Sequence, residues 1–248
     1  MSATESTPDA PERNATFAPT NWNLVLSAGQ SDAEAAAEAL AKLCRTYWYP
    51  LYAYVRRKGH NVHDAEDLTQ GFFEQLLRLQ SIKQVRGDGK FRSFLLSALE
   101  NYLAAEWNRA GRQKRGGHCA AISFDELELE ARYQLESLDE STPQRTYDRR
   151  WALTILDQAL DHLRRDCVAA GKEGLFEQLK GILSGDRPAA RYAEIGVMLN
   201  MSEVAVKVAA HRLRQRYAEL VREEVARTLT DPTEMEEEIR YLLAALSG

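Results

Sequence analysis

Residues Tyr192–Arg216, YAEIGVMLNMSEVAVKVAAHRLRQR, contain the pattern that decides the fold class. Two amphipathic segments flank a short break, which predicts two helices joined by a tight turn. The second segment opens at Ser202, a residue type that favours a helix N-terminus, and extends toward Thr228. Its expected buried stripe consists of Val206, Ala210, Leu213, Tyr217 and Leu220. The stretch therefore predicts a helix-turn-helix.

The second helix of this pattern carries basic side chains away from its buried stripe. Glu203, Lys207 and His211 recur at every fourth position and share one face. The N-terminal part of such a helix enters the major groove of DNA, and residues farther along contact phosphates. The expected DNA contacts are Ser202, Glu203, Lys207, His211, Arg212, Arg214 and Arg216. The alternative is a solvated face with a Glu203–Lys207 ion pair.

Helical periodicity also dominates the rest of the chain, and no strand alternation interrupts it, so we expect an all-α protein. The net charge of −5 is segregated: residues 83–115 have a local net charge of +5, and residues 125–140 one of −6. From these shifts we expect a disordered tail at 1–20, a helical domain at 21–117 and an acidic linker at 118–145. The helix-turn-helix domain follows at 146–229, and an acidic amphipathic extension at 230–248.

The composition argues against several classes of protein. The chain has no run of about eighteen apolar residues, so we expect no membrane span. Its N-terminus lacks the pattern of a signal peptide. The three cysteines, Cys44, Cys119 and Cys167, are widely spaced and form neither a disulfide framework nor a CxxC pair. We expect a cytoplasmic protein without metal or cofactor.

The segment DAEDLTQGFF, Asp64–Phe73, predicts a helix with one acidic face. Asp64, Asp67 and Gln70 share this face, and Glu66 lies beside it. Such a face either stays in solvent or docks on a basic protein surface, since DNA would repel it. His60 and His63 lie close to these carboxylates, which leaves a metal-dependent enzyme using His60, His63, Asp64 and Asp67 as an alternative.

The segment Phe91–Arg115 mixes cations, amides and an aromatic side chain, as proteins that bind unpaired nucleic acid do. The candidate residues are Arg92, Asn101, Trp107, Asn108, Arg109, Arg112, Lys114 and Arg115. The alternative is that Tyr102 and Trp107 belong to the core, because both continue apolar stripes of the predicted helix.

The C-terminal segment DPTEMEEEIRYLLAAL predicts a short amphipathic helix. Asp231 is its expected N-cap, Pro232 its first residue, and Met235, Ile239 and Leu242 share its apolar face. We expect this acidic helix to lie on the second domain and to restrain DNA binding.

Several motifs in a fixed order resemble bacterial sigma factors of the extracytoplasmic-function type. They are DAEDLTQGFF, GKFRSFLLSALENYL from Gly89, an acidic linker, and YAEIGVMLNMSEVAVKVAAHRLRQRY from Tyr192. The opening NWNLVLSAG, the phrase YWYPLYAYVRRKGH and the acidic C-terminal extension are most similar to one subgroup. The resemblance covers residues 20–245.

The resemblance implies a role for each segment. Asp64, Glu66, Asp67 and Gln70 would bind the β′ clamp of core RNA polymerase. The loop at 81–90, including Lys90, and the helix from Phe91 would capture a flipped base and open the minus-ten element. The linker would thread toward the polymerase active site, and the second domain would read the minus-thirty-five element and touch the β flap. An anti-sigma protein or a regulatory kinase is a further candidate partner.

The sequence departs from the family at two places, and one further alternative stays open. Val208 and Ala209 stand where the family usually has Ser-Arg, so a usual DNA-contacting arginine is absent. Ala105 stands where the family often has an aspartate. The alternative function is a stand-alone dimeric repressor or activator, which would bind half-sites about one helical turn apart.

Overall fold

The computed structural model describes residues 46–78, 90–110, 130, 133, 142–183, 189–229 and 231–247. Every regular element in these ranges is helical, which confirms the expectation of an all-α protein. A helical stretch at 46–57 precedes α3 (Val62–Arg78), α4 (Phe91–Ala110), α6 (Pro143–Ala169), α7 (Glu173–Leu183), α8 (Ala189–Leu199), α9 (Glu203–Ala226), the 3-10 turn η2 (Pro232–Glu234) and α10 (Met235–Ser247). The expected disordered tail at 1–20 and most of the linker at 118–145 lie outside the described residues.

Two helix starts have the caps that the sequence predicts. The Ser202 side chain accepts a hydrogen bond from the backbone N–H of Ala205, and it caps α9 as predicted. Asp231 accepts from the N–H of Thr233 at the start of η2, and Pro232 follows it. α6 begins at Pro143 after its cap Thr142, so it starts inside the linker expected at 118–145. The starts at Ser202 and Asp231 depend on local hydrogen bonds, and the sequence therefore predicts them well.

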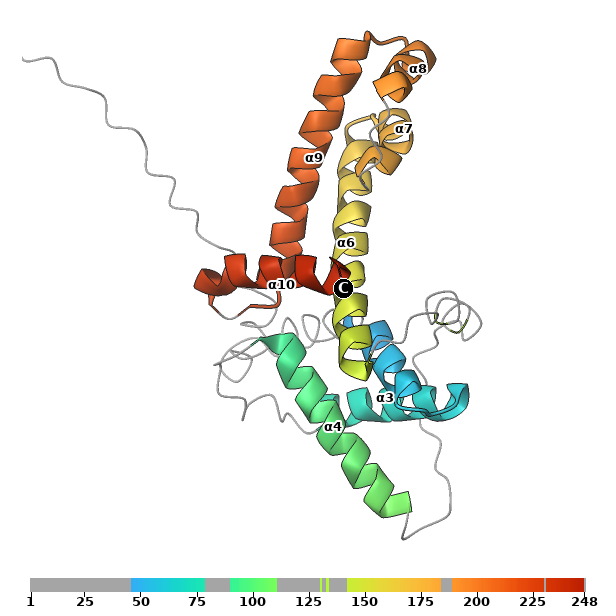
Figure 1. Cartoon of the computed structure of the whole chain (residues 1–248), viewed down its shortest axis with the longest axis vertical. Helices are drawn as coiled ribbons and strands as arrows, with labels where there is room; N and C mark the ends of the chain where they lie inside the picture. The colour runs from blue at the N-terminus through green and yellow to red at the C-terminus, as the bar shows by residue number, and fades with distance from the viewer. Residues whose placement is uncertain are drawn as a thin grey trace, which may run out of the picture.

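The long helices α6 and α9 lie side by side, and α7 and α8 cover one end of the pair (Figure 1). The helical stretch at 46–57, α3 and α4 gather at the other end. The predicted buried stripe of α9 is confirmed for Val206, Ala210, Leu213 and Leu220, while Tyr217 is half-buried. The apolar stripe of each long helix therefore faces protein along its length.

Two hydrophobic cores result from this arrangement, and α6 contributes to both. Tyr147, Trp151 and Ile155 pack into the first core, with residues of the 46–57 stretch, α3 and α4. Ala159 and Leu163 pack into the second core, with α7, α8 and α9. The change of core therefore falls inside α6, downstream of the linker expected at 118–145.

The C-terminal helix α10 crosses the base of the α6–α9 pair (Figure 1). Leu242 is buried in the first core, and Met235 and Ile239 pack against it, as their shared apolar face predicts. The helix lies on α6 and α9, and its acidic first turn reaches the start of α4. It thus joins the parts of the chain that form the two cores.

Candidate nucleic-acid and partner interfaces

The acidic face of α3 is open to solvent at two of its four expected positions. Asn61 holds the first turn: its amide donates to Asp64 at 2.8 Å and its carbonyl oxygen accepts from the Asp64 N–H at 2.9 Å. Asp64 and Asp67 are exposed, and Glu66 and Gln70 are half-buried. The opposite face is buried through Ala65, Thr69, Phe72, Phe73 and Leu76. The sequence therefore predicted correctly which side of this helix faces outward.

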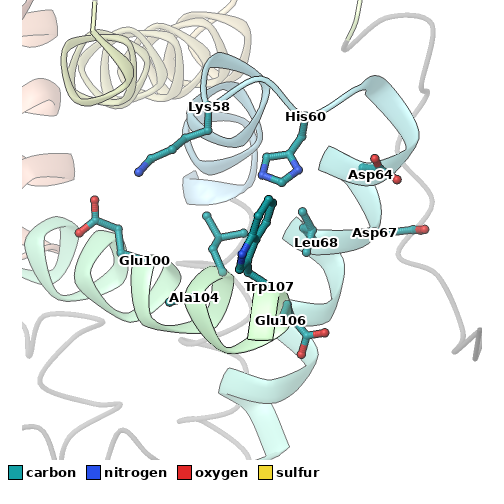
Figure 2. Close-up of a pocket in the computed structure, with 10 residues that line it drawn as sticks. Lys58, His60, Asp64, Asp67, Leu68, Glu100, Ala104, Glu106 and Trp107 are labelled. Carbon is teal, nitrogen blue, oxygen red and sulfur yellow. The ribbon is translucent and has the colours of Figure 1, made fainter. Parts of the chain in front are cut away.

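A pocket of about 660 Å³ lies between this face, the turn at 58–60 and α4 (Figure 2). Four carboxylates line it, from Asp64, Asp67, Glu100 and Glu106, along with the basic groups of Lys58 and His60. Its apolar lining comes from Leu68, Leu103, Ala104 and Trp107. An acidic pocket with an aromatic wall suits a cationic side chain from a partner.

Trp107 is 78% exposed, so the alternative that placed it in the core is wrong. Figure 2 shows its indole pointing from α4 toward His60 and Leu68. The α4 helix passes the edge of the bundle here, and its last turns extend beyond the core that buries Phe91, Leu95 and Leu99. For Tyr102 the core alternative is correct: its ring packs edge-on against Phe72, and burial raises the pKa of its hydroxyl to about 12.

Only some of the residues expected to bind unpaired DNA are both described by the structure and exposed. Asn101, Asn108 and Arg109 are exposed on α4, and Arg109 pairs with Glu106 at 2.6 Å. Arg112, Lys114 and Arg115 lie outside the described residues.

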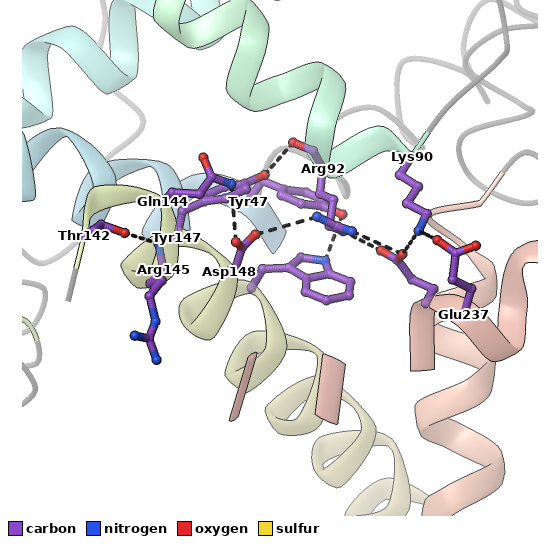
Figure 3. Close-up of polar contacts among 11 residues, drawn as sticks. Tyr47, Lys90, Arg92, Thr142, Gln144, Arg145, Tyr147, Asp148 and Glu237 are labelled. Atoms are coloured by element: carbon purple, nitrogen blue, oxygen red, sulfur yellow. Dashed lines mark hydrogen bonds and ion pairs between the residues drawn. The ribbon is translucent and has the colours of Figure 1, made fainter. Parts of the chain in front are cut away.

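Arg92 is placed differently from the expectation, because its side chain points into the protein. It is only 6% exposed, and its Nε lies 2.5 Å from Glu238 of α10. Lys90 is half-buried and contacts Glu237 and Glu238 at 2.7 and 3.0 Å (Figure 3). Burial works to lower the pKa of Arg92, but the hydrogen bond and charge of Glu238 outweigh it and raise the pKa, so Arg92 stays charged.

The turn between α8 and α9 is tight and has a specific backbone requirement. Asn200 adopts a left-handed conformation with φ 53°, and the Met201 N–H donates to the Gly196 carbonyl at 2.8 Å. A Cβ at Gly196 would lie 2.7 Å from the Met201 carbonyl oxygen. Only glycine therefore lets the two helices approach this closely without a shift of the backbone.

Gly196→Ala is expected to lower the free energy of unfolding by about 1–3 kcal/mol, because backbone must move to relieve the overlap. Gly174→Ala is the matched control: it also replaces a helical glycine, but nothing lies within 4 Å of its added Cβ. The control should be neutral or stabilising by up to about 1 kcal/mol. Urea titration of both variants measures the difference, and equal stability of the two would contradict the close approach.

The basic residues expected to contact DNA from α9 divide into an exposed set and a set that contacts neighbouring helices. Lys207, His211 and Arg212 are exposed, and Lys207 forms the expected ion pair with Glu203 at 2.6 Å. Arg214 instead donates to the Ile182 carbonyl and the Tyr192 hydroxyl, both at 3.3 Å. Arg216 pairs with Asp166 at 3.1 Å and with Glu223 at 3.0 Å. Arg214 thus points toward α7 and α8, whereas Arg216 stays at the surface, 41% exposed, with its charge paired to carboxylates.

Two valines on the outer face of α9 were not among the residues that the sequence analysis expected to contact DNA. Val204 is 70% exposed and Val208 44% exposed, one turn apart beside Lys207. Their spacing away from the buried stripe was the available signal. Ala209, where the resembling family has an arginine, is half-buried and packs against the second core. The outer face therefore combines apolar side chains with few cations.

Comparisons of the chain with protein-family models, with curated protein sequences and with solved structures return no match. The described residues hold no group of three or more His, Cys, Asp or Glu side chains arranged to bind a metal ion. The described residues therefore give no support to the alternative of a metal-dependent enzyme that uses His60, His63, Asp64 and Asp67. Within the same ranges, none of the helices combines the length and apolarity of a membrane span.

Proposed function

We propose that this protein is a sigma subunit that directs bacterial RNA polymerase core enzyme to promoters and assists strand opening. The proposal rests on the ordered motifs of the sequence, and one structural observation carries it furthest. The α3 face that the motif assigns to core polymerase is exposed at Asp64 and Asp67 and borders an acidic pocket. In this role the protein is not itself an enzyme, and it works in the cytoplasm.

The pocket adds a specific mode of partner binding to this proposal. Lysine or arginine side chains of the polymerase clamp would meet the carboxylates of α3, and the exposed Trp107 would stack on one of them. Four of the residues that line the pocket are acidic, against the basic Lys58 and His60, and this excess of negative charge favours a cationic side chain over a DNA phosphate. Trp107 thereby belongs with the polymerase-facing residues rather than with the strand-opening set.

The outer face of α9 would read the upstream promoter element. Lys207 can donate to guanine in the major groove, and Val204 and Val208 offer apolar contacts for thymine methyl groups. Arg212 lies farther along the helix and would contact a phosphate.

Run-off transcription with purified core polymerase on genomic fragments tests the proposed function. Discrete, promoter-dependent transcripts that need this protein support it, and their complete absence contradicts it. A stand-alone dimeric repressor is the competing function. Gel filtration and the symmetry of the bound DNA distinguish the two, since a repressor of this class would be a dimer on a palindromic site.

Lys207→Ala is expected to weaken binding to a preferred upstream sequence by about 1–3 kcal/mol, with a smaller loss on other sequences. The measurement is a competition binding assay with the assembled holoenzyme. Lys180→Ala is the matched control, because Lys180 forms a similar exposed helical ion pair, with Glu177 at 2.5 Å, away from α9's outer face. An equal loss for Lys207→Ala on all sequences would show a phosphate contact instead.

A further inference from the structure

The start of α4 and the C-terminal helix α10 form a single charged contact, made by Lys90, Arg92, Glu237, Glu238 and Tyr241. The Lys90 ammonium lies 2.7 Å from Glu237 and 3.0 Å from Glu238. The Arg92 guanidinium donates to both oxygens of Glu238, at 2.5 and 3.4 Å. Figure 3 shows Lys90 meeting Glu237 across the gap between the two helices. Glu237 and Glu238 of α10 thus neutralise Lys90, and Arg92 is paired with Glu238 and, at a longer 3.6 Å, with Asp148 of α6.

Aromatic rings complete this contact. The Arg92 guanidinium carbon lies 3.7 Å from the centre of the Tyr241 ring and 5.3 Å from that of Trp151. Two carboxylates on two cations, with a ring stacked on the guanidinium, reproduce the chemistry by which an unpaired nucleic-acid strand is held. In such a strand, phosphates would take the place of the carboxylates and a base the place of the Tyr241 ring.

The two carboxylates of this contact differ in their exposure to solvent, with Glu237 at the rim and Glu238 in the interior. Glu237 keeps 67% of its side-chain surface exposed, so its ion pair with Lys90 is screened and weak. Glu238 keeps 1%, and the cost of burying its charge offsets much of its attraction to Arg92. A competing polyanion that pairs with the same cations can therefore replace Glu237 first and Glu238 afterwards.

A second set of contacts keeps α10 attached to the rest of the protein. Arg222 of α9 pairs with Glu236 at 2.5 Å, and Leu242 is buried in the first core. These contacts do not involve Lys90 or Arg92. Release of the cations thus requires α10 to shift, not to unfold.

We propose that α10 is an internal competitor for unpaired DNA: its Glu237, Glu238 and Tyr241 occupy the nucleic-acid site at Lys90 and Arg92 until a strand replaces them. This inference rests on the proposed function, which makes the start of α4 a strand-opening site. It goes further by assigning the carboxyl-terminal helix the role of a substrate mimic. The free protein is then kept from binding single strands outside the polymerase complex.

The test compares the full-length protein with Glu237→Gln/Glu238→Gln, which removes both charges and keeps the side-chain shape. The probe is a fluorescein-labelled single strand of about twenty mixed nucleotides, long enough to span one binding site. The double variant should bind on the order of tenfold more tightly at low salt, because two cations are released. Its plot of log affinity against log salt should steepen by about 1.4, which is 0.7 for each additional phosphate contact.

Glu173→Gln/Glu177→Gln is the matched control. It also removes two carboxylates, but these lie on α7 and pair with Arg164 and Lys180, away from α10. Its salt slope should equal that of the natural protein. The single variant Glu237→Gln guards against misfolding, since this side chain is largely exposed, and it should steepen the slope by about 0.7.

Equal slopes for the natural protein, Glu237→Gln and the double variant would overturn the inference. Co-purification with core polymerase, measured in parallel, separates this failure from that of the proposed function. If the inference alone is wrong, all variants still bind core polymerase and the slopes coincide. If the proposed function is wrong, the natural protein does not bind core polymerase at all.

Discussion

Trp151→Ala is expected to lower the free energy of unfolding by about 3–5 kcal/mol, the range for removal of a large aromatic side chain from a packed core. Trp151 is fully buried, and its indole N–H donates to the Tyr47 hydroxyl at 3.0 Å. Its ring also lies beside the Arg92 guanidinium. The substitution therefore leaves a cavity and removes a hydrogen bond that joins α6 to the stretch at 46–57. Urea-induced unfolding followed by far-ultraviolet circular dichroism measures the loss.

Trp107→Ala is the matched control for this prediction. The same residue type is changed, but Trp107 is 78% exposed and contributes little packing. Its effect on stability should stay within about 0.5 kcal/mol. A large loss for Trp107→Ala, or a small one for Trp151→Ala, would contradict the placement of these two side chains.

Asp64→Arg combined with Asp67→Arg is expected to abolish binding to core RNA polymerase while the fold stays intact. Both side chains are exposed, and the Asn61 cap that starts α3 also accepts from the backbone of residue 64, which the substitution keeps. Loss of the first-turn acidic charge costs about 0.3–1 kcal/mol of helix stability, too little to unfold the domain. The reversed charges would repel a basic clamp surface. Pull-down of purified core enzyme measures binding.

The control for charge reversal as such is Asp157→Arg with Asp161→Arg. These two aspartates are exposed on α6, and their replacement changes the net charge by the same amount. This control should retain core-enzyme binding. If the Asp64/Asp67 variant bound core enzyme as well as the natural protein does, the acidic face of α3 would not be the polymerase-binding surface, and the proposed function would lose its main structural support.

The helices, their caps and the exposed face of α3 could be predicted because each depends on neighbours within a few residues. Ser202, for example, caps α9 through the N–H of Ala205, three residues away. The roles of single cations could not be predicted in this way. The candidate cations of α4 and α9 all looked available to DNA, because a sequence shows that a charge is present but not which distant residue pairs with it.

The sequence by itself thus determined the all-α class, the capped helix starts at Ser202 and Asp231, the buried stripe of α9 and the acidic side of α3, since helical periodicity and capping are local properties. Only the tertiary structure decided which cations face outward. Arg92 pairs with Glu238, 146 residues away, and Arg216 pairs with Asp166, 50 residues away. Trp107 continues a helical stripe and yet is exposed, because α4 extends past the core it packs on. Such partners meet only when distant helices pack. Folding therefore decides which cations pair with carboxylates and which remain exposed.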